Sequence, residues 1–222
     1  MRPFFLCIII AAAAFGKPSV RMLTYTVQGT NVRTNIFYRI VDERGLVSTG
    51  SNDNVIYDTS FDPEYTLRHW GFINLTNGNY LRVTNDGGVI HFASKLRGSQ
   101  PVSKVITIPK NSRHYPGFDQ AAHKMFLLGT NILSFHMMRP DTGDVFEMEV
   151  KITGRETIAI AGKPVDTIKV HGGLTGILAL MWSGAEYWFR AGDYEYVRFK
   201  GQMGPPGSPE AIMELVDEKV IK

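Results

Sequence analysis

The sequence predicts a mainly β protein: a single domain built from a curved antiparallel sheet, a half-barrel or barrel, with one helix packed against the concave face. Three observations support this prediction. Many short segments alternate apolar and polar residues, which is typical of strands with one buried face. Clusters of Gly, Asn, Asp and Pro separate these segments at short spacing. A single segment, 118–128, carries apolar residues at helical spacing instead.

The clearest strands lie within residues 145–200. Phe146, Met148, Val150 and Ile152 alternate with charged residues over 145–152, so one face of this strand is expected to be buried. Turns are expected at Gly154, 161–164 and 191–193. The strands that they separate are expected at 157–160, 166–170, 186–190 and 194–199. Short loops between consecutive strands favour antiparallel pairing.

The first half of the chain has the same organisation. Turns are expected at 28–31, 42–45, 62–64, 76–79 and 85–88, and the Asn77-Gly78 dipeptide is a strong hairpin signal. Strands are expected at 23–27, 35–41, 55–58, 67–75, 80–84, 89–93 and 102–108. About twelve strands in succession favour a meander that curls into a barrel or half-barrel.

The helical segment carries its apolar residues on one stripe: Phe118, Ala121, Ala122, Met125, Phe126 and Leu128. Gly117 precedes the stripe, and Gly129 can cap the end of the helix. A lone amphipathic helix in a β-rich chain must bury this stripe against a sheet. After it we expect a strand at 132–138, a loop at 139–144, a Gly- and Pro-rich loop or flap at 201–209, a last strand at 211–216 and a charged tail at 217–222.

Residues 1–16 are typical of a secretory signal peptide, and residues 17–222 form the expected exported domain. Arg2 supplies a positive start, residues 4–15 are apolar, and Ala14 and Gly16 are small residues at the positions that a signal peptidase reads. A buried N-terminal helix is the alternative. The apolar stretch is shorter than the roughly 20 residues of a membrane-spanning helix, and the apolar segment 174–182 is shorter still.

The only cysteine, Cys7, lies inside this leader, so the mature chain would contain no thiol. Disulfides, a cysteine nucleophile and zinc–thiolate sites are then excluded. A domain of this length can bury a core without disulfides. An exported domain that lacks them fits a bacterial periplasm. We therefore expect a periplasmic or secreted bacterial protein.

The charged residues exclude one class of partner and point to no catalytic site. The formal net charge is +3, falling to +2 without Arg2, and no basic run is present, so a nucleic-acid partner is not expected. His114, Asp119 and His123 lie close in sequence but match no metal-site spacing. Glu147 and Glu149 share a strand face, as paired catalytic carboxylates would, but also as in any half-exposed strand. We expect no enzyme, no catalytic residue, no metal and no cofactor.

Large apolar side chains give the stronger functional signal. If the curved sheet does not close on the helix, they would line a concave pocket suited to a lipid or another hydrophobic ligand. The alternative is that they fill the core, since aromatic residues dominate protein interiors. Our candidate ligand-binding residues are Trp70, Phe135, Trp182 and Trp188.

The chain resembles a family of exported Gram-negative bacterial proteins known only as a domain of unknown function. The features that carry the resemblance are turns and strand faces: Phe118-Asp119 at the helix start, Gly129 before a strand, 154–158, 161–170, Tyr187-Trp188-Phe189 followed by Asp193, and 214–216. The first half is similar more loosely, at Tyr25 and over 61–67. The loop at 201–209 is longer than the family pattern needs.

The resemblance implies a curved antiparallel sheet with a helix on its concave side, like the half-barrel of periplasmic lipoprotein carriers. It transfers no catalytic residue, because the family has none established. The expected function is that of an uncharacterised periplasmic protein that binds a lipid or other hydrophobic ligand in a half-barrel. The alternative is a non-enzymatic cell-envelope interaction or assembly protein with a filled core, whose partner is another envelope protein.

Overall fold

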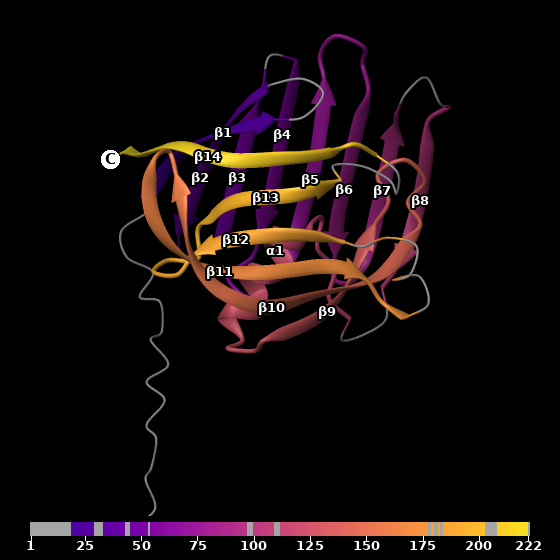
Figure 1. Cartoon of the computed structure of the whole chain (residues 1–222). Coiled ribbons are helices and arrows are strands. Elements are labelled where there is room, and N and C mark those ends of the chain that lie inside the picture. Colours follow the sequence, from indigo (N-terminus) through magenta and orange to yellow (C-terminus); the bar gives the residue numbers. More distant parts are fainter. Residues whose placement is uncertain are drawn as a thin grey trace, which may run out of the picture.

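A computed structural model describes residues 19–28, 33–42, 45–52, 54–96, 100–108, 112–176, 179, 182, 184–202 and 208–221. All the strands in this part of the chain belong to one antiparallel sheet that wraps around a single helix. In Figure 1 the first eight strands form the rear wall, the last six form the front wall, and helix α1 lies between them. The predicted mainly β fold with one helix on the concave face is confirmed.

The strands follow one another in the sheet almost as they do in sequence. The first wall contains β1 (Ser19–Gln28), β2 (Arg33–Asp42), β3 (Gly45–Ser51), β4 (Val55–Phe61), β5 (Leu67–Asn74), β6 (Tyr80–Asp86), β7 (Val89–Lys95) and β8 (Val102–Thr107). The second wall contains β9 (Ile132–Met138), β10 (Val145–Ile160), β11 (Lys163–Leu174), β12 (Ala185–Arg190), β13 (Tyr196–Gln202) and β14 (Glu210–Ile221), and α1 spans Phe118–Leu127.

The two walls meet where the first and last strands pair. β1 runs antiparallel to β14 from Val20 opposite Ile221 to Gln28 opposite Ile212. The sheet order runs from β8 through β1 and β14 to β9, so β8 and β9 are the two ends of the sheet as the structure describes it. The sheet therefore curls like a barrel but is not closed by hydrogen bonds between its ends.

Helix α1 is held by its apolar stripe. Phe118, Ala121, Ala122 and Met125 are buried, and the Phe118 ring lies 5.7 Å from that of Phe135 on β9. Further along the sheet, a Cβ atom at Gly172 would lie only 2.4 Å from the Phe118 ring, so β11 needs glycine there. The helix ends at Leu127, and Gly129 just beyond it has a φ of 64° that favours glycine, in keeping with the predicted cap.

Strand β3 is absent from the sequence prediction. The alternation of apolar and polar residues is hard to recognise in β3, because glycine occupies one of its inward-facing positions, Gly50. A glycine inside a strand usually indicates a break. Here the glycine is required, because a Cβ atom at Gly50 would lie 2.2 Å from the ring of Phe37 on β2. The larger neighbour occupies the space that a side chain on β3 would have filled.

Two other boundaries differ from the prediction. The turn expected at Gly154 is instead an irregularity in the register of β10, and the strand continues through it to Ile160. The charged tail expected at 217–222 is part of β14 up to Ile221. Its charge does not prevent pairing, because Glu218 accepts a hydrogen bond from Arg21 of β1 at 3.2 Å. Residues 203–207 of the predicted flap lie outside the described residues, as do the predicted leader, residues 1–16, and its Cys7.

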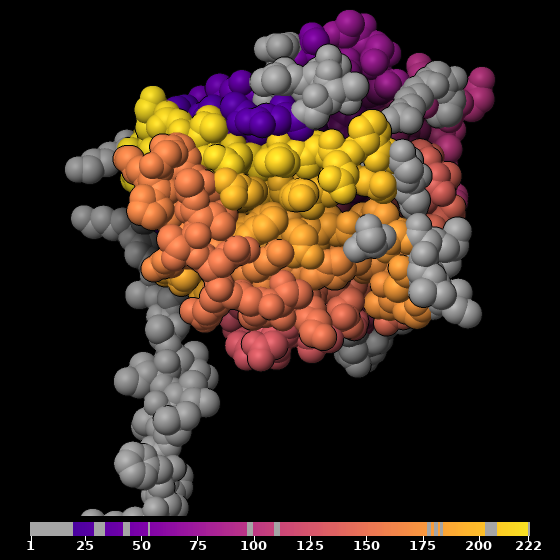
Figure 2. All heavy atoms as spheres, viewed as in Figure 1, coloured from indigo at the N-terminus to yellow at the C-terminus, as the bar shows by residue number. Residues whose placement is uncertain are grey.

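The long β10–β11 hairpin bends over the outer side of the second wall. Trp188 of β12 donates its indole N–H to Glu156 of β10 at 2.8 Å, and Arg198 of β13 donates to the carbonyl of Ala159 at 2.6 Å. Figure 2 shows the side chains of this hairpin, in orange, lying beside the yellow side chains of β14 on the front face. The hairpin thus forms a second layer outside the barrel.

The outer face of the first wall carries exposed apolar side chains. On β2 the apolar set Ile36, Tyr38 and Ile40 faces outward, while Phe37 and Arg39 face the interior. Cross-strand pairing places Ile221, Val20, Ile40 and Val47 in one row over four strands. Three members of this row are about two-fifths exposed: Ile221 at 41%, Ile40 at 37% and Val47 at 44%. No helix among the described residues is long and apolar enough to cross a membrane.

Candidate functional site

A cavity of about 110 Å³ remains inside the barrel between α1 and the first wall. Its lining comes from α1, from the interior faces of β1–β4 and from the strands that follow across the β1–β14 pair. The lining residues are Tyr25, Phe37, Arg39, Leu46, Ser48, Tyr57, Thr59, Phe61, Tyr65, Asp119, Gln120, His123, Phe189, Tyr196 and Met213. Aromatic rings and hydroxyl groups dominate this wall, and the helix contributes Asp119 and His123 to it.

The helix contributes polar residues from the side opposite its apolar stripe. Asp119 and Gln120 are consecutive, and His123 lies about one turn further along the helix, so all three side chains line the cavity on the side of the first wall. Gln120 donates a side-chain hydrogen bond to the Asp119 carboxylate at 2.8 Å. The His123 ring lies between two aromatic side chains, 5.8 Å from Tyr65 and 6.3 Å from Phe189. The helix therefore supplies polar side chains to a cavity whose other sides are mostly aromatic.

Burial shifts the pKa values of both ionisable groups on this helix face in the direction that favours the uncharged form. Loss of solvent raises the pKa of Asp119 to about 6, although Arg39 and backbone amides oppose the shift. Loss of solvent, reinforced by Arg39, lowers the pKa of His123 to about 3. At pH 7.5 His123 is therefore neutral, and Asp119 is ionised at an energetic cost.

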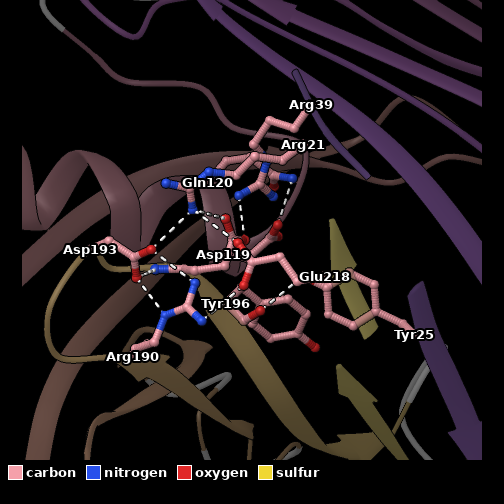
Figure 3. A network of polar contacts seen from close by, with 10 residues as sticks. Arg21, Tyr25, Arg39, Asp119, Gln120, Arg190, Asp193, Tyr196 and Glu218 are labelled. Carbon is pink, nitrogen blue, oxygen red and sulfur yellow. Dashed lines mark hydrogen bonds and ion pairs between the residues drawn. The ribbon is translucent and has the colours of Figure 1, made fainter. Parts of the chain in front are cut away.

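A network of charged side chains borders the cavity (Figure 3). Arg39 of β2 pairs with the buried carboxylate of Glu195 at 2.5 Å. Arg21 of β1 pairs with Asp193 at 3.0 Å and with Glu218 at 3.2 Å. These contacts join β1, β2 and β14 to the turn between β12 and β13, so they fix the seam between the two walls.

A third arginine completes the network from β12. Arg190 pairs with Asp193 at 2.8 Å and with Glu218 at 2.9 Å. Although burial acts in the opposite direction, hydrogen bonds from Arg190 and Arg21 hold the pKa of Asp193 at about 2. The Asp193 carboxylate therefore keeps its negative charge at neutral pH between two guanidinium groups.

Three of the residues that line the cavity carry buried polar atoms without a hydrogen-bond partner. They are Nε of Arg39, Oε1 of Gln120 and the hydroxyl of Tyr196. By contrast, the neighbouring Tyr25 hydroxyl donates to the backbone carbonyl of Tyr196 at 2.8 Å. Buried polar atoms in proteins are nearly always paired. All three atoms belong to residues that line one cavity, so the polar groups of the cavity wall are not all paired within the protein.

The four aromatic residues proposed from the sequence are not gathered in one place, and none of them lines this cavity. Phe135 is buried against Phe118, and Trp182 lies 5.7 Å from the same ring. Trp70 is half-buried on β5 against the core. Trp188 lies on the outer side of β12, beneath the β10–β11 hairpin. That these four residues bind a ligand stays a prediction.

The histidine and glutamate residues noted in the sequence are also dispersed. Asp119 and His123 meet at the cavity, but His114 is buried beside β9, where it forms an isolated bridge with His136. Burial lowers the pKa of His114 to about 4. Glu147 and Glu149 lie on the outer face of β10. Within the described residues, no three His, Cys, Asp or Glu side chains are grouped closely enough to hold a metal ion.

Sequence reasoning missed Arg39 and Glu195, the central pair of the charged network. A weak signal was present in β2, where Arg39 alternates with Phe37 and Val41 on the face opposite Ile36, Tyr38 and Ile40. The structure places the more apolar of these two faces outside. Glu195 lies in a turn that is far from Arg39 in sequence, so no local pattern relates the two residues.

The fold has a counterpart among solved structures. A β-barrel-like protein of the domain of unknown function DUF1849 from Brucella abortus superposes with a TM-score of 0.57 over 92% of this chain and 98% of that chain. The sequence identity is 8%, so the likeness concerns the fold alone. The coarse expectation of a β-barrel-like fold is therefore confirmed. The chain matches no protein-family model and no curated protein sequence.

Proposed function

We propose that this protein is an exported, non-enzymatic binding protein that holds a compact ligand in the cavity between α1 and the first wall. The observation that carries the proposal is the cavity itself, with unpaired polar atoms on Arg39, Gln120 and Tyr196 in its lining residues. A filled structural core would place apolar side chains at this position. A ligand with a polar group would supply the missing hydrogen-bond partners.

The size of the cavity narrows the ligand class. Pockets for drug-sized molecules measure about 300–1,000 Å³. A cavity of about 110 Å³ is smaller than that, so a complete lipid would not fit within it. The lipid or hydrophobic ligand expected from the sequence is therefore narrowed to a compact molecule, or to the compact end of a longer one. The aromatic wall would contact its apolar part.

Filling the cavity with a side chain tests the proposal. Ser48 lines the cavity, whereas the next residue of β3, Thr49, faces outward and is exposed. A Ser48→Phe variant places a ring in the cavity, and Thr49→Phe adds the same ring to the outer surface of the same strand. Both variants and the wild type would be isolated gently from a bacterial periplasmic extract and examined by native mass spectrometry, which also shows whether the leader has been removed.

A small adduct retained by the wild type and by Thr49→Phe, but lost from Ser48→Phe, is the expected result. An adduct that survives in Ser48→Phe would place the ligand elsewhere. A bare mass for all three proteins, after incubation with a small-molecule extract of the same cells, would contradict the binding function. Circular dichroism and thermal melting establish that the two variants are folded.

A second candidate function is supported by a separate observation. The exposed apolar row that includes Ile40, Val47 and Ile221 lies on the outer face, away from the cavity. Such a row suits an envelope interaction or assembly protein. Cross-linking in native cells distinguishes this candidate, because it requires a specific neighbour that is lost when Ile40 and Val47 are both changed to Lys and kept in Ser48→Phe.

A further inference from the structure

We infer that the ligand of this cavity is a compact organic ammonium ion, held by the Asp119 carboxylate within a wall of tyrosine and phenylalanine rings. This inference rests on the proposed binding function and names its ligand class. Three features carry it: the charge balance around the cavity, the isolation of Asp119, and the arrangement of the rings.

The charges of the bordering network balance without Asp119. Its three guanidinium groups belong to Arg21, Arg39 and Arg190, and its three carboxylates belong to Asp193, Glu195 and Glu218. Each member lies within 3.2 Å of a partner of opposite charge. The positive charge on Arg39 is matched by Glu195, and although it partly opposes the rise in the pKa of Asp119, it forms no ion pair with that carboxylate.

Asp119 is the carboxylate that remains. Among the described residues no Lys, Arg or His side chain lies within 4 Å of its oxygens. Its polar contacts are with the side-chain amide of Gln120 and with the backbone amides at the start of α1. Burial without a cationic partner disfavours the ionised form, and an ammonium group bound beside it would remove that penalty.

Four of the aromatic rings around the cavity contact one another in succession. Tyr196 stacks on Tyr25 at 5.5 Å, Tyr25 meets Phe37 edge to face at 5.9 Å, and Phe37 lies 6.1 Å from Tyr57. All four line the cavity. A second pair, Phe61 and Tyr65, stacks at 4.5 Å and lines it too. Aromatic faces attract cations, and cages of such rings recognise ammonium groups.

Other ligand charges suit the cavity less well. An anion would face the ionised Asp119, and Nη1 of Arg39 already pairs with Glu195. A wholly apolar ligand would leave Asp119 without a cationic partner. The remaining donors near the cavity, Nε of Arg39 and the hydroxyl of Tyr196, would serve a hydroxyl or carboxylate at the other end of the ammonium compound.

A pair of isosteric molecules tests the inference. Choline carries a trimethylammonium group and a hydroxyl, and 3,3-dimethylbutan-1-ol has the same shape with a neutral carbon in place of the nitrogen. Isothermal titration calorimetry of the full protein at pH 7.5 is expected to show choline binding. The neutral isostere should bind at least about tenfold more weakly, because it has no charge for Asp119 or for the rings.

Two variants separate the carboxylate from the rest of the cavity. Asp119→Asn keeps the size of the side chain and is expected to remove the preference for choline, whereas Glu149→Gln, on the outer face of β10, should leave it intact. Equal binding of choline and the neutral isostere to the wild type would overturn the ammonium inference and leave the proposed binding function standing. Absence of choline binding would also overturn the inference, while the Ser48→Phe comparison continues to decide the binding function by itself.

Discussion

The two faces of helix α1 meet the sheet in different ways. Toward β9–β12 the fit is tight enough that Gly172 has no room for a Cβ atom beside Phe118. Toward β1–β4 the same helix presents Asp119 and His123 to a cavity of about 110 Å³. A single short helix therefore completes the core on one side and forms the floor of a polar site on the other.

The difference is not caused by a shortage of large side chains on the open side. The cavity is lined by rings that could fill it, but neighbouring groups hold them in place. Tyr25 is an example, because it stacks on the Tyr196 ring and its hydroxyl donates to the Tyr196 carbonyl. The space therefore lies among rings that already have partners in the wall, and charged groups border it.

The packed face should be the more sensitive of the two. Phe118→Ala removes a buried ring that contacts Phe135, Tyr187 and Trp182. We expect the free energy of unfolding to fall by about 3–5 kcal/mol, as is usual for Phe to Ala changes in cores. Urea denaturation measures this loss. Leu127→Ala, at a position of the same helix that is 61% exposed, should change stability by less than about 0.5 kcal/mol.

Breaking the charged border of the cavity should have the next largest effect. Glu195→Gln leaves Arg39 without its ion-pair partner, and we expect a loss of about 2–4 kcal/mol in the free energy of unfolding. The exposed pair between Arg139 and Asp141 is a suitable control, because Asp141→Asn should cost less than about 1 kcal/mol. If Glu195→Gln lowered the free energy of unfolding no more than the control does, water would have to solvate Arg39. The charged border of the cavity would then not distinguish this side of α1 from the packed side.

Removing the isolated charge should stabilise the protein. The pKa of Asp119 is raised in the folded state, so the folded protein holds this proton more tightly than the unfolded chain does. The penalty for ionisation is therefore absent below about pH 3.8 and develops as the pH rises to about 6. Asp119→Asn should raise the free energy of unfolding by about 1–2 kcal/mol at pH 7.5.

Urea denaturation of the wild type and of Asp119→Asn between pH 3.5 and 7.5 measures this effect. The gain should vanish at the acidic end of the range, where the carboxyl group of the wild type is protonated in both states. Glu149→Gln, on the outer face of β10, should show no such dependence. A stabilisation that is independent of pH would show that the ionised carboxylate is not the cause.

The smallest expected effect concerns the outer layer of the second wall. Trp188→Phe keeps an aromatic ring but removes the hydrogen bond from the indole to Glu156. We expect a loss of about 1 kcal/mol. Thermal melting measures it, and Trp188→Phe should leave choline binding unchanged because this residue lies outside the barrel. A change in ligand affinity would show that the hairpin supports the site through the wall.

The fold could be predicted from local patterns because apolar and polar residues alternate along the strands, and clusters of Gly, Asn, Asp and Pro mark the turns. The helix was found for the same reason, since Phe118, Ala122 and Met125 recur at helical spacing. The prediction failed where contacts with a residue on a neighbouring strand decide whether a position belongs to a strand. Gly50 fits within a strand because the ring of Phe37 fills the space that a side chain there would need. Glu218 fits within a strand because Arg21 and Arg190 donate hydrogen bonds to its carboxylate.

The candidate site could not be predicted in the same way. Its parts come from β1–β4, from α1 and from the turn after β12, and they meet only when the sheet has curled. Asp119 could be placed on a helix from the sequence, but its isolation could not, because that depends on where Arg39 and Glu195 lie. The face of β2 that carries Arg39 lines the cavity, although the opposite face is the more apolar one.

The pairing of β1 with β14 has a consequence for how quickly the molecule reaches this structure. Every other strand pair joins neighbours in sequence, but this one joins the two ends of the described chain and must form before the walls become one sheet. Contacts of such long sequence separation slow folding. Because Val20 lies opposite Ile221, a short linker could connect the two strands in a circular permutant opened between β8 and α1. That chain would form the same barrel from hairpins alone, and it should refold faster than the natural order.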